Sequence, residues 1–162
     1  MSLKPSDSFT IRAATLEDEE TLLAQRRAMF FDIGYQDPQV LDTMASLFRI
    51  WLRQKMQTGE YRAWLVVAPD SSVAAGAGLW LMDWPPMVFA MGSPRANILN
   101  VYTQPENRRQ GLARRLMTVI LDWCRENRIQ AVILHASDEG RPLYESLGFR
   151  PTKEMRLMLG ED

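Results

Sequence analysis

The spacing of apolar residues predicts that the chain begins with a strand followed by a helix. Phe9 and Ile11 fall on one face of the run 8–13, the two-residue period of a half-buried strand. From Thr15 onward the apolar residues recur at helical spacing. Thr15 and the acid three residues later resemble a capping box, which marks the start of a helix. This helix is expected to run to about Ile33, before a glycine that favours a helix end.

A second helix is predicted from Asp37 to Gly59. Aspartate is a favourable N-cap, and Pro38 suits the first helical position. Large apolar residues, including Phe48 and Trp51, recur along it at helical spacing. This aromatic stripe is interpreted as core packing, with contact between one ring and a substrate as the alternative.

Two strands are predicted to follow as a hairpin, over residues 61–68 and 73–82, with a turn at 69–72. Gly76 and Gly78 weaken the second strand, so a bulge or a close neighbour is expected beside them.

The loop 83–94 is rich in proline and also in large apolar side chains, among them Trp84, Met87 and Phe89. Loops normally lie at the surface, so exposed side chains of this kind would indicate a surface for a ligand or a partner. The alternative is that the loop folds back over the core. The sequence leaves both interpretations open.

The second half of the chain predicts a strand ending at Thr103, then a helix from Gly111 to about Asn127. A short apolar run at 131–135 is typical of a buried parallel strand. A helix capped by Ser137 or Asp138 is expected next, with a proline in its first turn and a glycine at its end.

The remaining residues, 149–159, are expected to form a last strand or pair of short strands. The predicted order is therefore β-α-α-β-β-β-α-β-α-β, one α/β domain with a mixed sheet over residues 1–162. The second to fourth strands pair antiparallel, and the fourth and fifth are parallel through a right-handed crossover.

Composition limits the possible functions. The formal charge of −1 gives no general attraction to nucleic acid or to an anionic membrane, and no apolar run is long enough to span a bilayer. The single cysteine and single histidine exclude intramolecular disulfides and provide no cluster for a metal. The N-terminus does not resemble a signal peptide. We expect a cytoplasmic protein without a bound metal.

The segment around Gly111 suits a phosphate group. A strand, a short loop and a helix start follow one another here, and arginines flank the glycine at 108, 109, 114 and 115. The first turn of a helix has N–H groups without internal partners and the positive end of the dipole. Glycine lets a diphosphate approach the backbone closely. Arg115 is instead interpreted as part of a solvated helix face.

Two motifs resemble the GNAT superfamily of acetyl-CoA-dependent acyltransferases. Arg108-x-x-Gly111-x-Ala113 lies between a strand and a helix, where that superfamily has its first motif. The run from Leu143 to Phe149, Leu-Tyr-Glu-Ser-Leu-Gly-Phe, resembles the second. The order of elements agrees over essentially the whole chain. A dinucleotide-binding fold is disfavoured, because the loop lacks G-x-G-x-x-G.

The resemblance implies that acetyl-CoA is the cosubstrate. Its pyrophosphate would contact the loop and the helix start, and its pantetheine arm would lie between the fourth and fifth strands, which splay apart in this superfamily. Ser137 stands where many relatives have asparagine and would donate to the arm. The implied cofactor-binding residues are Val101, Tyr102, Thr103, Arg108, Arg109, Gln110, Gly111, Leu112, Ala113, Arg114 and Ser137.

Tyr144 is the predicted catalytic residue. When an amine attacks the thioester, the sulfur leaves as a thiolate. A thiol has a pKa of about 8.5 and a phenol of about 10, so the tyrosine hydroxyl can donate its proton to the sulfur. In the superfamily a tyrosine at this place in the motif is the usual general acid. The alternative is a core tyrosine on an amphipathic helix.

The general base is not evident. Many relatives use a glutamate on the fourth strand, where this chain has Asn97 and Asn100. A water chain, or His135 at the end of the fifth strand, is the alternative. The absence of that glutamate also supports a second function, a catalytically silent acyl-CoA-binding regulatory module.

The predicted acceptor is a primary amine, either a small molecule or a terminal amine. Its predicted contacts are Phe31, Tyr35, Trp84 and Asn100. Nucleic-acid binding is disfavoured, because the arginine cluster spans only one helical turn. Many relatives are dimers, so the resemblance admits a homodimer as well as a monomer.

Overall fold

The computed structural model describes residues 8–92 and 94–160. Residues 1–7, where no signal peptide is expected, lie outside this range, as do residues 161–162 and residue 93 of the predicted loop 83–94. Five strands form one sheet in the order β1-β2-β3-β4-β5. The strands are β1 (Thr10–Ala13), β2 (Tyr61–Val67), β3 (Val73–Met82), β4 (Arg95–Thr103) and β5 (Val132–Leu134).

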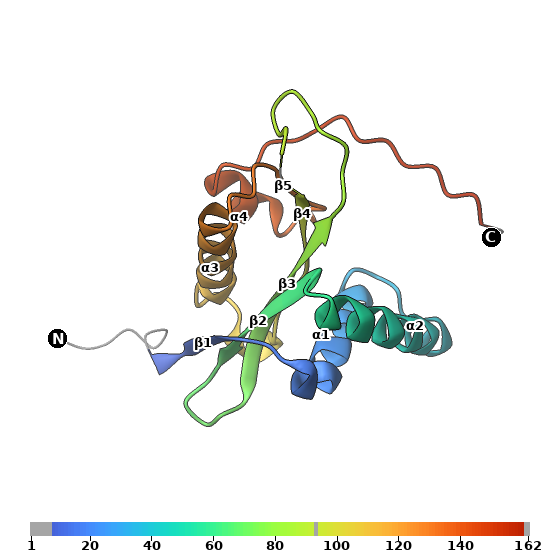
Figure 1. Ribbon diagram of the computed structural model, residues 1–162. Helices are drawn as coiled ribbons and strands as arrows, with labels where there is room; N and C mark the ends of the chain where they lie inside the picture. The colour runs from blue at the N-terminus through green and yellow to red at the C-terminus, as the bar shows by residue number, and fades with distance from the viewer. Residues whose placement is uncertain (1–7, 93, 161–162) are drawn as a thin grey trace.

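Helices cover both faces of the sheet, with α1 and α2 on one side and α3 and α4 on the other (Figure 1). The α-helices are α1 (Glu19–Asp32), α2 (Pro38–Gln57), α3 (Leu112–Glu126) and α4 (Arg141–Ser146), and two 3₁₀ turns are η2 (Leu16–Asp18) and η3 (Pro105–Asn107). Each face buries its own apolar cluster, one against α3 and the other between the sheet and the α1–α2 pair. Cys124 of α3 is buried in the first cluster.

Local sequence signals explain how the first two helices begin and end. Thr15 and Asp18 form the expected capping box at the turn that leads into α1. Gly34 has a φ of 112°, which glycine tolerates, just after α1 ends. The Asp37 carboxylate accepts hydrogen bonds from the N–H groups of Gln39 and Val40 at the start of α2.

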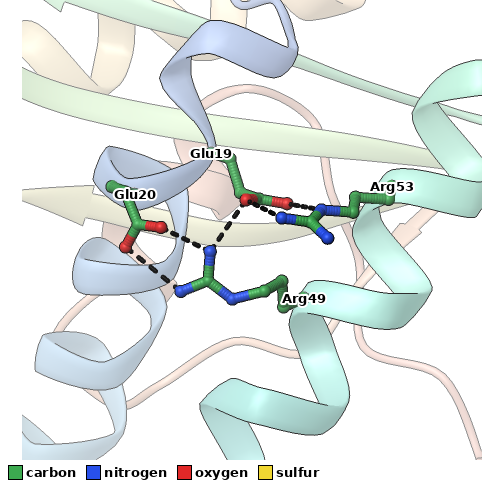
Figure 2. Close-up of polar contacts among 4 residues, drawn as sticks. All are labelled: Glu19, Glu20, Arg49 and Arg53. Carbon is green, nitrogen blue, oxygen red and sulfur yellow. Dashed lines mark hydrogen bonds and ion pairs between the residues drawn. The ribbon is translucent and has the colours of Figure 1, made fainter.

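Ion pairs join α1 to α2 around the buried side chain of Glu19. Glu19 lies between two arginines of α2, Arg49 and Arg53, and Glu20 also pairs with Arg49 (Figure 2). The hydrogen bond from Arg53 and the second one from Arg49 hold the pKa of the Glu19 carboxyl below its usual range. The acidic groups of this helix pair are therefore neutralised by specific partners.

The two glycines of β3 make room for side chains that cross them. A Cβ on Gly76 would lie 2.2 Å from Gln25 Oε1, and one on Gly78 would lie 2.0 Å from the Tyr61 hydroxyl oxygen. The expectation of a close neighbour at both positions is confirmed. The gap over Gly78 lets Tyr61 reach β4, where Asn100 Nδ2 donates to its hydroxyl at 3.0 Å.

Gly78→Ala is expected to lower the free energy of unfolding by about 1–3 kcal/mol, because the added methyl group must displace the buried Tyr61 ring. Urea denaturation measures the change. Gly92→Ala is the matched control, since a Cβ there would meet nothing within 4 Å, and it should change stability by less than about 0.5 kcal/mol. Equal stability of the two variants would contradict the packing role of Gly78.

A bulge in β4 and an early end to the β4–β5 ladder create an opening in the sheet. Gly76 pairs with Tyr102 and Gly78 with Leu99, so Asn100 and Val101 together face one residue of β3. Asn100 has a φ of 57°, which asparagine adopts more readily than most residues.

The parallel pairing of β4 with β5 spans only three pairs and ends at Ile98 with Leu134. The expected mixed sheet with splayed parallel strands is therefore confirmed.

The expected last strand is wrong. Residues 149–159 form no strand, and the C-terminal segment runs away from the sheet (Figure 1). Met155 and residues 157–159 are 77–94% exposed. A strand needs a neighbour to pair with, whereas Pro151 lacks an N–H and β5 offers an edge only three residues long. Apolar content alone therefore does not place this segment in the sheet.

The last helix begins later than expected. α4 begins at Arg141, and neither Ser137 nor Asp138 caps it. Ser137 Oγ instead accepts a hydrogen bond from the N–H of Gly140 at 3.1 Å and so closes the turn before the helix. The proline in the first turn is where the sequence predicts it.

Candidate active site

One pocket lies where β4 extends beyond its pairing with β5. It is bounded by the end of α1, the end of β4, the loop before α3 and the turn into α4. The sequence-predicted residues that line it are Val101, Tyr102, Thr103, Arg108, Arg109, Gly111, Leu112, Ala113, Arg114, Ser137 and Tyr144. Of the predicted cofactor-binding set, only Gln110 does not line it.

The loop before α3 adopts a backbone that exposes its N–H groups. Arg109 and Gly111 both have positive φ values, 62° and 77°. Alternation of left-handed residues with ordinary ones turns successive N–H groups toward one concave side, which binds anions. A Cβ on Gly111 would meet nothing within 4 Å, so the space beside this residue is open to a ligand.

The arginines of this segment have different partners. Arg108 Nη2 pairs with Asp32 at 2.6 Å, and its Nε donates to the Thr103 carbonyl at 3.0 Å, so it ties the loop to α1 and β4. Arg114 donates to Ser146 Oγ of α4 at 2.7 Å. Arg109 is exposed at the rim. The loop's positive groups therefore combine a fixed structural arginine with cations nearer solvent.

Arg115 is not part of a solvated face, contrary to the sequence-based expectation. Its Nη2 donates to the Phe9 carbonyl at 2.9 Å, just before β1, and the bond is partly buried. The first strand lies 106 residues away in sequence, so no local pattern could predict this contact.

Tyr144 lies buried at the inner wall of the pocket. Burial raises the pKa of its phenol, which therefore stays protonated at neutral pH. A Cβ on Gly140 would lie 2.8 Å from the Tyr144 ring, so the ring needs a glycine one turn earlier. Its ring also makes an edge contact with Phe149, at 6.1 Å between ring centres. A positioned, neutral phenol is a competent proton donor.

A buried polar network lies beneath the β4 bulge. Asn100 connects Tyr61 to Arg26 of α1, whose Nη1 donates to Asn100 Oδ1 at 2.5 Å. Burial raises the pKa of Tyr61 to about 12, so this hydroxyl also stays neutral. Asn100 directly precedes Val101, so this network lies next to a residue that lines the pocket.

The predicted acceptor residues do not surround one pocket. Phe31 and Tyr35 lie exposed around the end of α1, and neither lines the pocket of Tyr144. Trp84 lines a different pocket with Gly59 and Leu81, and the Arg95 guanidinium lies 4.5 Å from its ring centre. The loop 83–94 does not cover the core, since Val88, Phe89 and Met91 are 67–88% exposed.

Several lining residues escaped sequence reasoning. Met29 and Ile33 reach the pocket from α1, and Glu139 reaches it from the turn before α4. The spacing of Met29 and Ile33, four residues apart on one helix face, is a signal, but it does not distinguish a pocket from a core. His135 lies outside this pocket, with its Nε2 3.0 Å from Glu154 Oε1.

Two further properties concern ligands and membranes. Among residues 8–92 and 94–160, no three His, Cys, Asp or Glu side chains are grouped so as to hold a metal ion. The described helices include none with the length and apolar character needed to cross a bilayer.

Comparison with known proteins agrees with this geometry. The model of the acetyltransferase (GNAT) family matches residues 23–149. A GCN5-related N-acetyltransferase from Ralstonia eutropha JMP134 is 32% identical, with 93% of this chain and 98% of that chain covered and a TM-score of 0.87. The search of curated proteins found no match.

Two more distant structures support the fold alone. A predicted acetyltransferase from Clostridium acetobutylicum, crystallised with acetyl-CoA, is 24% identical over 93% of this chain and 95% of that one, with a TM-score of 0.83. Glucosamine-6-phosphate N-acetyltransferase from Arabidopsis thaliana is 18% identical over 95% and 99%, with a TM-score of 0.64.

Proposed function

The chain belongs to the acetyltransferase (GNAT) family, and we propose that it transfers the acetyl group of acetyl-CoA to a primary amine by direct attack. One observation carries this proposal. The buried, neutral Tyr144 lines the same pocket as the left-handed loop at Arg109 and Gly111. An anion-binding loop and a proton donor therefore face one space.

The pocket fits the parts of acetyl-CoA in order. The loop N–H groups and the positive end of α3 suit the pyrophosphate. Residues 101–103 of β4 have no partner on β5, so this strand edge suits the amides of the pantetheine arm. The Clostridium acetobutylicum relative, whose crystal contains acetyl-CoA, has a similar fold and supports this choice of cosubstrate.

The reaction then needs two proton transfers. The amine attacks the thioester carbonyl, the C–S bond breaks, and Tyr144 protonates the departing sulfur. An alkyl amine with a pKa of about 10.4 must first lose a proton, which costs about 4.6 kcal/mol at pH 7. Described residues of β4 include no carboxylate, so we propose that water carries this proton away.

The test is thiol release from acetyl-CoA with a panel of amines: amino acids, polyamines, aminoglycosides and peptides with free N-termini. Turnover with one class supports acetyl transfer and identifies the acceptor. CoA binding by calorimetry without turnover on any amine would favour the silent acyl-CoA-binding module, which the missing carboxylate on β4 supports. Absence of both binding and turnover would overturn both functions.

A further inference from the structure

A half-buried arginine lies under the β4 bulge without an acidic partner. The Arg26 guanidinium carbon lies 4.9 Å from the ring centre of Phe30 and 4.6 Å from that of Phe48. Its Nη1 donates a hydrogen bond to the neutral side chain of Asn100. Burial lowers its pKa, which means that the surroundings disfavour the charge. A cation in such a place normally has a counter-charge.

The neighbouring arginines of α1 and α2 each have an acidic partner. Arg27 pairs with Asp42 at 2.8 Å, and Arg49 and Arg53 share Glu19 (Figure 2). Within residues 8–92 and 94–160, no carboxylate forms an ion pair with Arg26. The helix pair thus neutralises its other arginines and leaves this one positive.

Unpartnered polar atoms occur on α1 and on β4. Among the described residues, the buried side-chain atoms without a hydrogen-bond partner are Gln25 Nε2, Arg26 Nε and Asn97 Oδ1. Gln25 and Arg26 are adjacent on α1. Asn97 stands opposite Trp80 in the ladder, on the sheet face that packs against α1 and α2. Buried polar groups almost always have partners, and a ligand with acceptor oxygens would supply one for the guanidinium of Arg26.

The unpartnered groups define the chemistry of that molecule. Arg26 offers positive N–H donors, and Asn97 offers a carbonyl oxygen that accepts an N–H. Arg26 donates to Asn100, which directly precedes Val101, and Val101 lines the pocket of Tyr144. A ligand here would therefore reach the place where acetyl transfer is proposed.

Resting on the proposed function, we propose that the acceptor is an amine that also carries a carboxylate, such as an amino acid. Arg26 binds the carboxylate, and Asn97 accepts a hydrogen bond from the amine. A single unpaired guanidinium matches a singly charged carboxylate better than a dianionic phosphate, which would need a further cation. The same positive charge disfavours polyamines and aminoglycosides.

The experiment compares amino acids with their C-terminal amides, which keep the amine and lose the negative charge. For the native protein and its preferred amino acid, kcat/KM is expected to be at least about tenfold higher for the acid than for the matching amide. This difference is the size of one charge-assisted contact. Arg26→Gln should abolish this preference, mainly through a higher KM for the acid. Arg26→Lys keeps the charge and should restore part of the preference.

Arg27→Gln is the matched control, because Arg27 is adjacent in sequence but pairs with Asp42 on the surface. It should keep the native preference. Turnover without preference for the acid, or a preference that survives Arg26→Gln, overturns this inference and leaves the proposed acetyl transfer intact.

If no amine is acetylated, the proposed transferase function fails, and calorimetry with saturating CoA decides the inference separately. Binding of the acid but not the amide, lost in Arg26→Gln, supports the carboxylate site. Equal binding of both compounds, or of neither, overturns it. Urea denaturation of each variant separates a local effect from loss of fold.

Discussion

Tyr144→Phe is expected to lower kcat about 100-fold, the usual contribution of a positioned general acid. Proton donation to the sulfur assists departure of the CoA thiolate, and the buried phenol of Tyr144 lines the pocket as a neutral donor. KM for acetyl-CoA should change little, because the hydroxyl contributes to the transition state rather than to ground-state binding. Steady-state thiol release with the preferred amine measures both constants.

The phenylalanine variant is also a clean structural comparison. It keeps the ring, its edge contact with Phe149 and its fit over Gly140. Calorimetric CoA affinity should therefore match that of the native protein. A kcat within about threefold of the native value, at unchanged affinity, would remove Tyr144 from the mechanism.

The pH dependence of kcat gives an independent check on the same group. The protonated phenol is the active form, and burial raises its pKa above the ordinary value. Loss of the acid therefore begins only above about pH 10, the ordinary pKa of tyrosine. In the native protein, kcat should not fall between pH 7 and pH 9.5. A decline centred in that interval would contradict the assignment.

Gly111→Val is expected to weaken CoA binding about 10- to 100-fold. Gly111 has a φ of 77°, and a β-branched residue there is strained by about 1–3 kcal/mol. To relieve this strain the backbone changes its φ, which turns the loop N–H groups away from the pyrophosphate. The new side chain also enters the open space beside the loop. Calorimetric titration with CoA measures the loss.

Gly59→Val supplies the matched comparison. Gly59 has nearly the same φ, 74°, but follows α2 and lines the pocket of Trp84 instead. It should destabilise the fold to a similar degree. CoA affinity should stay within about twofold of the native value, since strain at a distant site does not change the contacts between the loop before α3 and CoA. Equal loss of affinity in both variants would show that backbone strain, not the phosphate contact, explains the result.

The sequence predicted the features that depend on neighbouring residues. The capping box at Thr15, the N-cap at Asp37 and the left-handed glycine at 34 each involve groups a few residues apart. The motif around Gly111 was also local, and the structure brings most of its residues to one pocket with Tyr144. In each of these features, the groups that interact lie only a few residues apart in the sequence.

Features that join distant segments were missed. The ion pair of Arg108 with Asp32 spans 76 residues, and the hydrogen bond of Arg26 to Asn100 spans 74. Both depend on how α1 lies against the sheet, which no local pattern encodes. The error over residues 149–159 has the same origin. Apolar residues gave that segment a strand-like composition, but its strand partner had to come from elsewhere in the fold.

The buried cysteine of α3 has a practical consequence for these measurements. Burial raises the pKa of Cys124 to about 11, so at neutral pH the thiol is protonated and shielded from reagents. Since it is the only cysteine in the sequence, the folded protein should contribute almost no background when released CoA is detected with a thiol-reactive dye. A single cysteine introduced at the surface could likewise be labelled selectively without replacing the native one.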